Sequence, residues 1–320
     1  MDVVLGLDTS CYTTSCALSG GGGLIGQQRR LLTVEKGGRG LMQSEGVFQH
    51  VGRLPALVER LLEEAGHPRV AAVCASTRPR PVEGSYMPVF TVSEGFGRSM
   101  AAALNVPFFA TSHQEGHIRA AMVDTALRPE DSFLALHLSG GTTEIVRVAQ
   151  GKLELIGGSN DLHAGQFVDR VGVRLGLPFP AGPELEALAR RGRAQARLPI
   201  WVRGSECSFS GSESAAQRLI DAGGISPEDM AAEVYSCVAR AVAKTLWNAA
   251  RQTGEKKLLL AGGVASSALL RALLPDRMRR LGADVALSWG RPELSGDNAA
   301  GVALIGYEKL TEGKTHGEAD

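Results

Sequence analysis

Short apolar runs separated by amphipathic stretches make up the first third of the chain. Glycines at 20–23 predict a hairpin turn, and apolar runs rich in strand-forming residues predict strands over 3–7, 16–19, 24–29, 70–76 and 106–111. Apolar residues at helical spacing predict helices over about 44–65 and 93–104, and we expect Pro55 to kink or divide the first of them. This order indicates a three-stranded meander followed by βαβ units.

The same pattern starts again in the middle of the chain. A tight turn is expected at 139–141, among strands over 133–138, 142–148 and 153–157. The segments 5–18 and 134–146 both run from an apolar strand through a small, hydroxyl-bearing turn into a second apolar strand. Such similarity indicates a degenerate internal repeat.

The repeat predicts an α/β fold of two similar lobes, each with a βββαβα core. We set the lobes at 1–130 and 131–320, with a helix at 298–311 as a candidate to pack back on the first lobe. Ser226 as N-cap, followed by a proline and two acids, predicts a helix to about residue 253. A buried strand at 257–261 is expected to turn through two glycines into a helix at 266–281.

Composition limits the class of protein. With 320 residues, 44% hydrophobic and 21% charged, and no apolar run approaching eighteen residues, the sequence predicts a soluble globular protein with no membrane segment. The N-terminus leads directly into a strand, without the features of a signal peptide, so we expect a cytoplasmic location. Five cysteines, an odd number without a Cys-x-x-Cys pair, indicate reduced thiols. The net charge is zero, so any nucleic-acid partner would require a local basic patch or helper subunits.

Two histidines provide the clearest candidate chemistry. His113 and His117 are four residues apart at the start of an expected helix, so both imidazoles project from one face and can reach one metal ion. The alternative is a pair of solvated helix histidines. A zincin helix requires Glu directly after the first His, whereas Glu115 is two residues along, so metallopeptidase chemistry is not implied.

Small-residue turns are candidate phosphate sites. The turns at 9–10 and 139–142 combine hydroxyls with accessible backbone N–H groups, and the glycines at 262–263 let an adenosine approach bare backbone. Glycine hairpins are also common for structural reasons alone. Because the sequence contains neither a Walker A motif nor Gly-x-Gly-x-x-Gly, the pattern favours the architecture of actin, sugar kinases and heat-shock ATPases.

Seven segments in the same order extend these observations over nearly the whole chain. They are Gly6-Leu-Asp-Thr-Ser-Cys11, His113-Gln-Glu-Gly-His117, Leu138-Ser-Gly-Gly141, Val168-Asp-Arg-Val-Gly172 with Pro180-Ala-Gly-Pro183, Ser208-Phe-Ser-Gly211, Ala261-Gly-Gly-Val264 and Gly296-Asp-Asn298. On these segments the chain resembles the tRNA threonylcarbamoyltransferase family. The resemblance implies an acyltransferase that moves a threonylcarbamoyl group from an adenylate to N6 of the adenosine next to the tRNA anticodon, using iron or zinc.

The resemblance also implies roles for individual residues. His113, His117 and Asp297 would be metal ligands, with Asp297 reaching the ion from the second lobe. His137, at the position of a tyrosine ligand in archaeal members, would be a fourth ligand, although it is equally a histidine packed on a strand. The residues that would bind the substrate nucleotide are Leu138, Ser139, Gly140, Gly141, Thr142, Asp169, Gly182, Glu184, Gly262, Gly263 and Ser267. No nucleophilic side chain is required, and Cys11 is more simply structural.

The chain departs from the family pattern within its functional segments. The departures are Tyr12 and Thr13 in place of acidic residues, Thr142 in place of His or Asn, Glu213 near an expected Lys, Ser267 in place of Asn, and the segment 78–83 in place of a Gly-Pro-Gly stretch. Two hypotheses therefore stay open. The first is a tRNA-modifying enzyme that acts with a related actin-like subunit and a small ATPase subunit, in which case the helix at 44–65 either packs internally or forms an interface. The second is a nucleotide-binding paralogue that handles carbamoyl groups or regulates a partner.

Overall fold

Two compact units make up the protein. The computed structural model describes residues 2–10, 12–21, 23–33, 41–194 and 198–317. The first unit combines residues 1–123 with residues 296–320, and the second comprises residues 124–295. The chain therefore enters the second unit and then returns to the first. The sequence predicted lobes at 1–130 and 131–320, with a helix at 298–311 as a candidate to pack back on the first lobe. In the structure the second unit begins at residue 124, and residues 296–320 belong to the first unit.

The first unit is built on a five-stranded sheet in the order β3-β2-β1-β4-β5. The pairs β1·β2 and β2·β3 are antiparallel, whereas β1·β4 and β4·β5 are parallel. Its elements are β1 (Asp2–Thr9), β2 (Thr13–Gly20), β3 (Gly23–Leu31), α1 (Gln43–Glu64), β4 (Arg69–Arg78), α2 (Phe90–Leu104), β5 (Phe108–Ser112), α3 (His113–Ala121) and α9 (Ala300–Gly317).

The second unit contains a seven-stranded sheet in the order β12-β11-β6-β7-β8-β10-β9. Its strands are β6 (Phe133–Leu138), β7 (Thr143–Ala149), β8 (Lys152–Ser159), β9 (Trp201–Arg203), β10 (Glu206–Ser208), β11 (Lys257–Ala261) and β12 (Ala286–Trp289). Its helices are α4 (Ala164–Arg174), α5 (Gly182–Ala189), α6 (Ser210–Asp221), α7 (Pro227–Thr253), α8 (Ala268–Arg280) and the short 3-10 helix η1 (Pro292–Leu294).

The two sheets share one topology. In β8-β7-β6-β11-β12, as in β3-β2-β1-β4-β5, an antiparallel meander supplies three strands and two parallel strands follow on the side of the first. The short strands β10 and β9 extend the second sheet beyond β8. The repeated pattern in the sequence therefore corresponds to a duplicated core.

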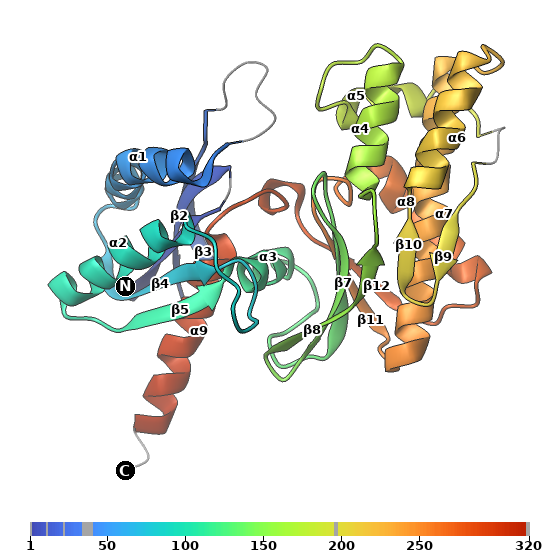
Figure 1. Cartoon of the computed structure of the whole chain (residues 1–320). Coiled ribbons are helices and arrows are strands. Elements are labelled where there is room, and N and C mark those ends of the chain that lie inside the picture. Colours follow the sequence, from blue (N-terminus) through green and yellow to red (C-terminus); the bar gives the residue numbers. More distant parts are fainter. Residues whose placement is uncertain (1, 11, 22, 34–40, 195–197, 318–320) are drawn as a thin grey trace. The chain divides into compact units, whose positions relative to one another are not determined.

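Helices cover both faces of the first sheet, because its central strand is apolar on both sides. Val3, Leu5 and Leu7 of β1 are buried against the helices α1 and α2, whereas Val4, on the opposite face, is buried against Val302 of α9 (Figure 1). A central strand buried on both faces reads as a continuous apolar run rather than an alternating one. This is the reason that residues 3–7 of the sequence show no alternation.

Contacts between small residues let α3 and α9 approach closely. A Cβ on Gly301 of α9 would lie 1.8 Å from the carbonyl oxygen of Gly116 in α3, and a Cβ on Gly116 would lie 3.0 Å from Val302. Only glycine at 301 permits this backbone contact. The contact brings the start of α9 against the middle of α3.

The predictions for individual elements had mixed outcomes. α7 begins after Ser226, whose hydroxyl accepts from the Asp229 N–H as predicted. α1 contains Pro55 but is a single helix, so Pro55 does not divide it. No elements were predicted between residues 158 and 225, where the structure has α4, α5, β9, β10 and α6.

The described cysteines Cys16, Cys74, Cys207 and Cys237 are buried and free, and burial raises the pKa of the Cys16 thiol to about 12.

Some predicted features lie outside the described residues: Cys11, Gly22 of the expected hairpin turn and the end of the polar tail. Among the described helices, none has the length and apolar character needed to cross a lipid bilayer.

Candidate metal centre and substrate pocket

A capped helix presents the two histidines. β5 ends at Ser112, which is the N-cap of α3: its hydroxyl accepts from the Glu115 N–H, and the Glu115 carboxylate accepts from the Ser112 N–H at 2.7 Å. This capping box fixes the first turn, in which His113 is the first residue. Glu115 is therefore held in a structural role, consistent with the absence of a zincin motif.

His113 and His117 converge with Asp297. Their Nε2 atoms are 3.0 Å apart, and Asp297 Oδ1 lies 3.2 Å from His117 Nε2 and 3.6 Å from His113 Nε2. The side chains are 20%, 11% and 31% exposed for His113, His117 and Asp297, so a ligand from solution can reach the group. Among the described residues, these three form the group of His, Cys, Asp and Glu side chains close enough to hold a metal ion.

Asp297 belongs to the first unit. It lies in the segment before α9, and its Oδ2 accepts a hydrogen bond of 2.8 Å from Ser10 Oγ. The expectation that it would reach the histidines from the second lobe is therefore wrong. The physical reason is the small-residue contact between α9 and α3, which draws the chain back to the first unit.

Buried hydrogen bonds surround the group formed by His113, His117 and Asp297. Asp8 is fully buried at the end of β1, and its Oδ1 lies 3.0 Å from His113 Nδ1 and also accepts from Ser76 Oγ. Its Oδ2 has no hydrogen-bond partner among the described residues. His50, also fully buried, lies between Thr14 Oγ1 and the Ser10 carbonyl at 2.8 Å from each, and burial lowers its pKa.

Electrostatics couples the carboxylates to the imidazoles. Burial alone would lower the pKa of His113, but the Asp8 and Asp297 carboxylates raise it well above its ordinary value. Burial alone would raise the pKa of Asp297, but hydrogen bonds from His113 and His117 and their charge hold it well below its usual range. The carboxylates that favour a positive charge on the imidazoles would favour a bound cation for the same electrostatic reason.

The geometry fits a metal ion. Bonds of 2.0–2.2 Å to imidazole nitrogen and carboxylate oxygen in a tetrahedral site imply ligand atoms roughly 3.4 Å apart, and the three observed separations lie between 3.0 and 3.6 Å. His113 directs Nδ1 to Asp8, which leaves Nε2 for the ion, as is usual for a metal-binding histidine. His137 belongs to the second unit, where it pairs with Ala261 and Glu144 in the sheet, and its role as a fourth ligand stays a prediction.

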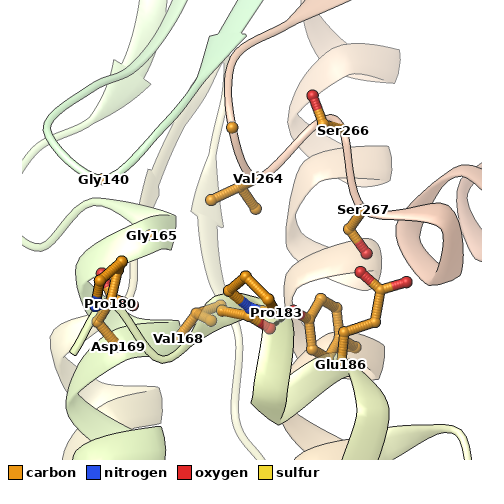
Figure 2. Close-up of a pocket in the computed structure, with 13 residues that line it drawn as sticks. Gly140, Gly165, Val168, Asp169, Pro180, Pro183, Glu186, Val264, Ser266 and Ser267 are labelled. Atoms are coloured by element: carbon orange, nitrogen blue, oxygen red, sulfur yellow. Dashed lines mark hydrogen bonds between the residues drawn. The ribbon is translucent and has the colours of Figure 1, made fainter. Parts of the chain in front are cut away.

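A pocket of about 410 Å³ lies within the second unit. Figure 2 shows Asp169 and Pro180 on one side of it and Glu186 and Ser267 on the other. Its wall consists mainly of backbone and small side chains, and its residues are Gly140, Gly165, Val168, Asp169, Pro180, Gly182, Pro183, Glu186, Tyr235, Gly263, Val264, Ser266 and Ser267. A volume of this size suits a nucleoside or a comparable small molecule.

The pocket brings together part of the predicted nucleotide site. Of the predicted residues, those in its wall are Gly140, Asp169, Gly182, Gly263 and Ser267, and those outside it are Leu138, Ser139, Gly141, Thr142, Glu184 and Gly262. Leu138 and Gly262 have a structural contact instead: a Cβ on Gly262 would lie 2.4 Å from the Leu138 carbonyl oxygen, which also accepts from the Val264 N–H. Ser139 and Thr142 close the turn, with the Ser139 N–H donating to the Thr142 carbonyl.

Glu186 and Tyr235 are pocket residues that sequence reasoning missed. Glu186 Oε1 accepts from the Leu269 N–H at 2.9 Å and from Arg190 at 2.7 Å, so its carboxylate is held at the wall. The Tyr235 hydroxyl donates to the Gly182 carbonyl at 2.9 Å. Gly182 and Glu186 are four residues apart on α5 and both line the pocket, whereas Glu184 lies two residues from each. This helical spacing would have favoured Glu186 over Glu184, but the sequence did not predict a helix there.

The Asp161 carboxylate binds the Ser208-Phe-Ser-Gly segment through hydrogen bonds. Asp161 accepts from the hydroxyls of Ser208 and Ser210 and from the backbone N–H groups of Leu162 and Phe209. Partial burial would raise the pKa of Asp161, but these hydrogen bonds outweigh it and lower the pKa to about 2. Asp161 therefore ties β8 to the start of α6.

Comparison with known proteins agrees with the segments found in the sequence. Residues 34–304 match the family model described as tRNA N6-adenosine threonylcarbamoyltransferase. A protein of that name from Thermus thermophilus is 36% identical over 320 residues, covering 97% of this chain and 94% of the relative.

Solved structures with low sequence identity share the fold. HypF from T. kodakarensis superposes with a TM-score of 0.64 at 16% identity, over 97% of this chain and 48% of that one. A glucokinase of the ROK family from Streptomyces griseus, solved with glucose and AMPPNP, gives a TM-score of 0.56 at 13% identity, over 96% of this chain and 99% of that one. The predicted two-lobed fold of the actin and sugar-kinase type is confirmed.

Proposed function

Since the chain belongs to the tRNA N6-adenosine threonylcarbamoyltransferase family, we propose that it transfers a threonylcarbamoyl group from an adenylate to N6 of the tRNA adenosine next to the anticodon, with the aid of a metal ion held by His113, His117 and Asp297. The convergence of those three side chains on one point is the observation that carries the metal-dependent part of the proposal. Iron and zinc both suit two imidazoles and a carboxylate.

Each unit contributes residues with a distinct task. In the second unit, Asp169 and Glu186 would accept hydrogen bonds from ribose hydroxyls, and the bare backbone at Gly182 and Gly263 would lie against the nucleoside. Backbone N–H groups of the 139–141 turn would donate to the phosphate or the carbonyl oxygen. In the first unit, Asp8 would keep His113 oriented with Nε2 free.

The chemistry is acyl transfer. The N6 amine attacks the carbamoyl carbon, the bond from that carbon to the phosphate oxygen breaks, adenylate leaves with the electron pair, and the amine proton passes to solvent. A bound metal would supply Lewis acidity and fix the position of the threonylcarbamoyl group. No side chain of the protein forms a covalent intermediate in this scheme, so it makes no use of the buried thiols.

Other proteins are part of the proposal. The family acts on tRNA, yet this chain has no net charge, so we propose that helper subunits, a related actin-like protein and a small ATPase, supply basic surface. We further propose that it works in the cytoplasm, where tRNA is available.

The direct test is transfer to unmodified tRNA by the purified chain, with and without partner proteins and metal, read by mass spectrometry of the nucleosides. We expect modified adenosine only when metal is present. Retained nucleotide binding with no transfer in any combination would favour the paralogue hypothesis instead.

A variant tests the metal site itself. His113→Ala should lose bound metal, whereas His67→Asn should keep it; His67 is an exposed residue with φ of 50°, a conformation that asparagine accepts. Unchanged metal content in His113→Ala would remove the proposed site.

A further inference from the structure

The last residue of β4 and the loop that follows it, residues 78–87, lie beside the first turn of α3 and carry two arginines and an exposed tyrosine. We propose that this loop, called here the arginine loop, binds the single-stranded anticodon loop of tRNA, with Arg78 and Arg80 on phosphates and Tyr86 stacked on a base. The inference rests on the proposed function, because it assumes that tRNA is the substrate.

Backbone contacts fix the arginine loop to the metal helix. Arg78 is the last residue of β4, and its Cα pairs with that of Ser112, the residue before His113. The next residue, Pro79, accepts a hydrogen bond of 3.0 Å from the Gln114 N–H in the first turn of α3. An RNA held by this loop is therefore held next to the candidate metal ligands.

The charge of this region suits an anion. Arg78 and Arg80 are both exposed. Among the described residues, none forms an ion pair with Arg78. The acid of α3, Glu115, is already engaged with Ser112, so it does not compete for the Arg78 guanidinium. Glu83 is the loop's own acid, which leaves the arginine loop with one net positive charge in a chain whose net charge is zero. Guanidinium groups bind phosphate oxygens with bidentate geometry.

The loop is ordered before it binds. The Arg80 N–H donates to Ser85 Oγ at 3.0 Å and the Ser85 N–H donates to the Val82 carbonyl at 3.2 Å, while Pro79 and Pro81 restrict the backbone. Tyr86, 68% exposed, is presented to solvent at the end of this turn. Preorganisation lowers the entropy cost of binding.

Arginines with an aromatic side chain match single-stranded RNA in particular. Sequence-tolerant binding of unpaired nucleotides combines cationic contacts to the backbone with stacking of bases on aromatic rings. Protein recognition of RNA is concentrated on loops, whose bases can be splayed out. A free mononucleotide would use one phosphate contact and show little dependence on salt, which separates it from a tRNA loop.

The test measures affinity for an unmodified anticodon stem-loop RNA by fluorescence anisotropy at several salt concentrations. We expect Arg78→Ala to weaken binding several-fold and the double variant Arg78→Ala/Arg80→Ala to weaken it further. Each substitution should lower the slope of log Kd against log salt by about 1, because one phosphate fewer is neutralised by the protein. Arg69→Ala is the matched control and should bind the RNA like the wild type, since the Arg69 side chain is 78% exposed and lies at the opposite end of β4. Equal affinities for Arg78→Ala and Arg69→Ala would overturn the proposal.

Tyrosine variants test the stacking contact. Tyr86→Ala should weaken binding about tenfold without changing the salt slope, and Tyr86→Phe should restore it. Unchanged affinity in Tyr86→Ala, or a wild-type chain that binds no RNA even at low salt, would overturn the proposal. Failure of the proposed function is distinct: the wild type would bind the RNA with the expected loop dependence and yet form no modified adenosine.

Discussion

Asp8 Oδ1 lies 3.0 Å from His113 Nδ1, although the two residues are 105 positions apart in the chain. A carboxylate only accepts hydrogen bonds, so Nδ1 of the imidazole carries the proton and Nε2 faces His117 and Asp297. The buried carboxylate thus selects the ring orientation that a metal-binding histidine requires.

Asp8→Asn should lower metal affinity about 10- to 100-fold, because the neutral amide makes a weaker acceptor and reduces the basicity of the imidazole. The measurement is the metal Kd by competition with a chromophoric chelator. Asp2→Asn, at the partly exposed opposite end of β1, is the control and should bind metal like the wild type. Equal affinities for the two variants would contradict an orienting role for Asp8.

Gly301→Ala should separate α9 from α3. The new Cβ would lie 1.8 Å from the Gly116 carbonyl oxygen, and overpacking of this kind lowers the free energy of unfolding by about 1–3 kcal/mol. Because Asp297 lies just before the start of α9, we also expect weaker metal binding. Urea denaturation and the chelator assay measure the two effects.

The same helix offers the control for that variant. Gly313, also in α9, has no atom within 4 Å of the Cβ position, so Gly313→Ala should keep or raise stability through its better helix propensity. If Gly301→Ala were as stable as Gly313→Ala, the close contact between α3 and α9 would not be the element that holds Asp297 near the histidines.

The sequence predicted those parts of the site that depend on local spacing. His113 and His117 share a helix face at i and i+4, and both reach the same point. Asp297 was predicted only through the family resemblance, and it was placed in the wrong unit. The chain comes back to the first unit at α9 because Gly301 fits against Gly116, and the sequence does not reveal that contact. Asp8 was missed because a contact between a strand end and a distant helix leaves no periodic signal.

Glycines also explain why the region after residue 158 had no predicted elements. α4 contains Gly165 and Gly172, which disfavour helix by intrinsic propensity. Both are required by packing: a Cβ on Gly165 would lie 2.5 Å from Gly140 Cα, and one on Gly172 would lie 2.4 Å from Ala181 Cβ. Tertiary contacts therefore override local preference at these positions, and the duplicated strands were easier to find than the helices inserted between them.

Glu186→Gln should weaken nucleotide binding about tenfold, because a charged acceptor in the pocket wall is replaced by a neutral one. Glu184 is exposed on another face of α5, so Glu184→Gln should bind nucleotide normally. Titration calorimetry with a non-hydrolysable adenylate analogue distinguishes the two. The opposite ranking would restore Glu184, the residue predicted from the sequence, as the ligand.

The lowered pKa of Asp161 leads to a specific prediction for the pH dependence of the free energy of unfolding. Its folded pKa of about 2 lies below an unfolded value of about 3.9, so the carboxylate stabilises the protein above pH 4 and loses that contribution as the pH falls from about 4 towards 2. Because the group is largely exposed, solvent screening reduces the contribution to about 1 kcal/mol. Asp161→Asn should therefore be less stable than the wild type in urea at pH 7, with the difference shrinking towards pH 3. Asp284→Asn removes one charge from a side chain that is 93% exposed and should follow the wild type at every pH. A constant gap between Asp161→Asn and the wild type would mean that the hydroxyl contacts of Ser208 and Ser210 stabilise the protein independently of the carboxylate charge.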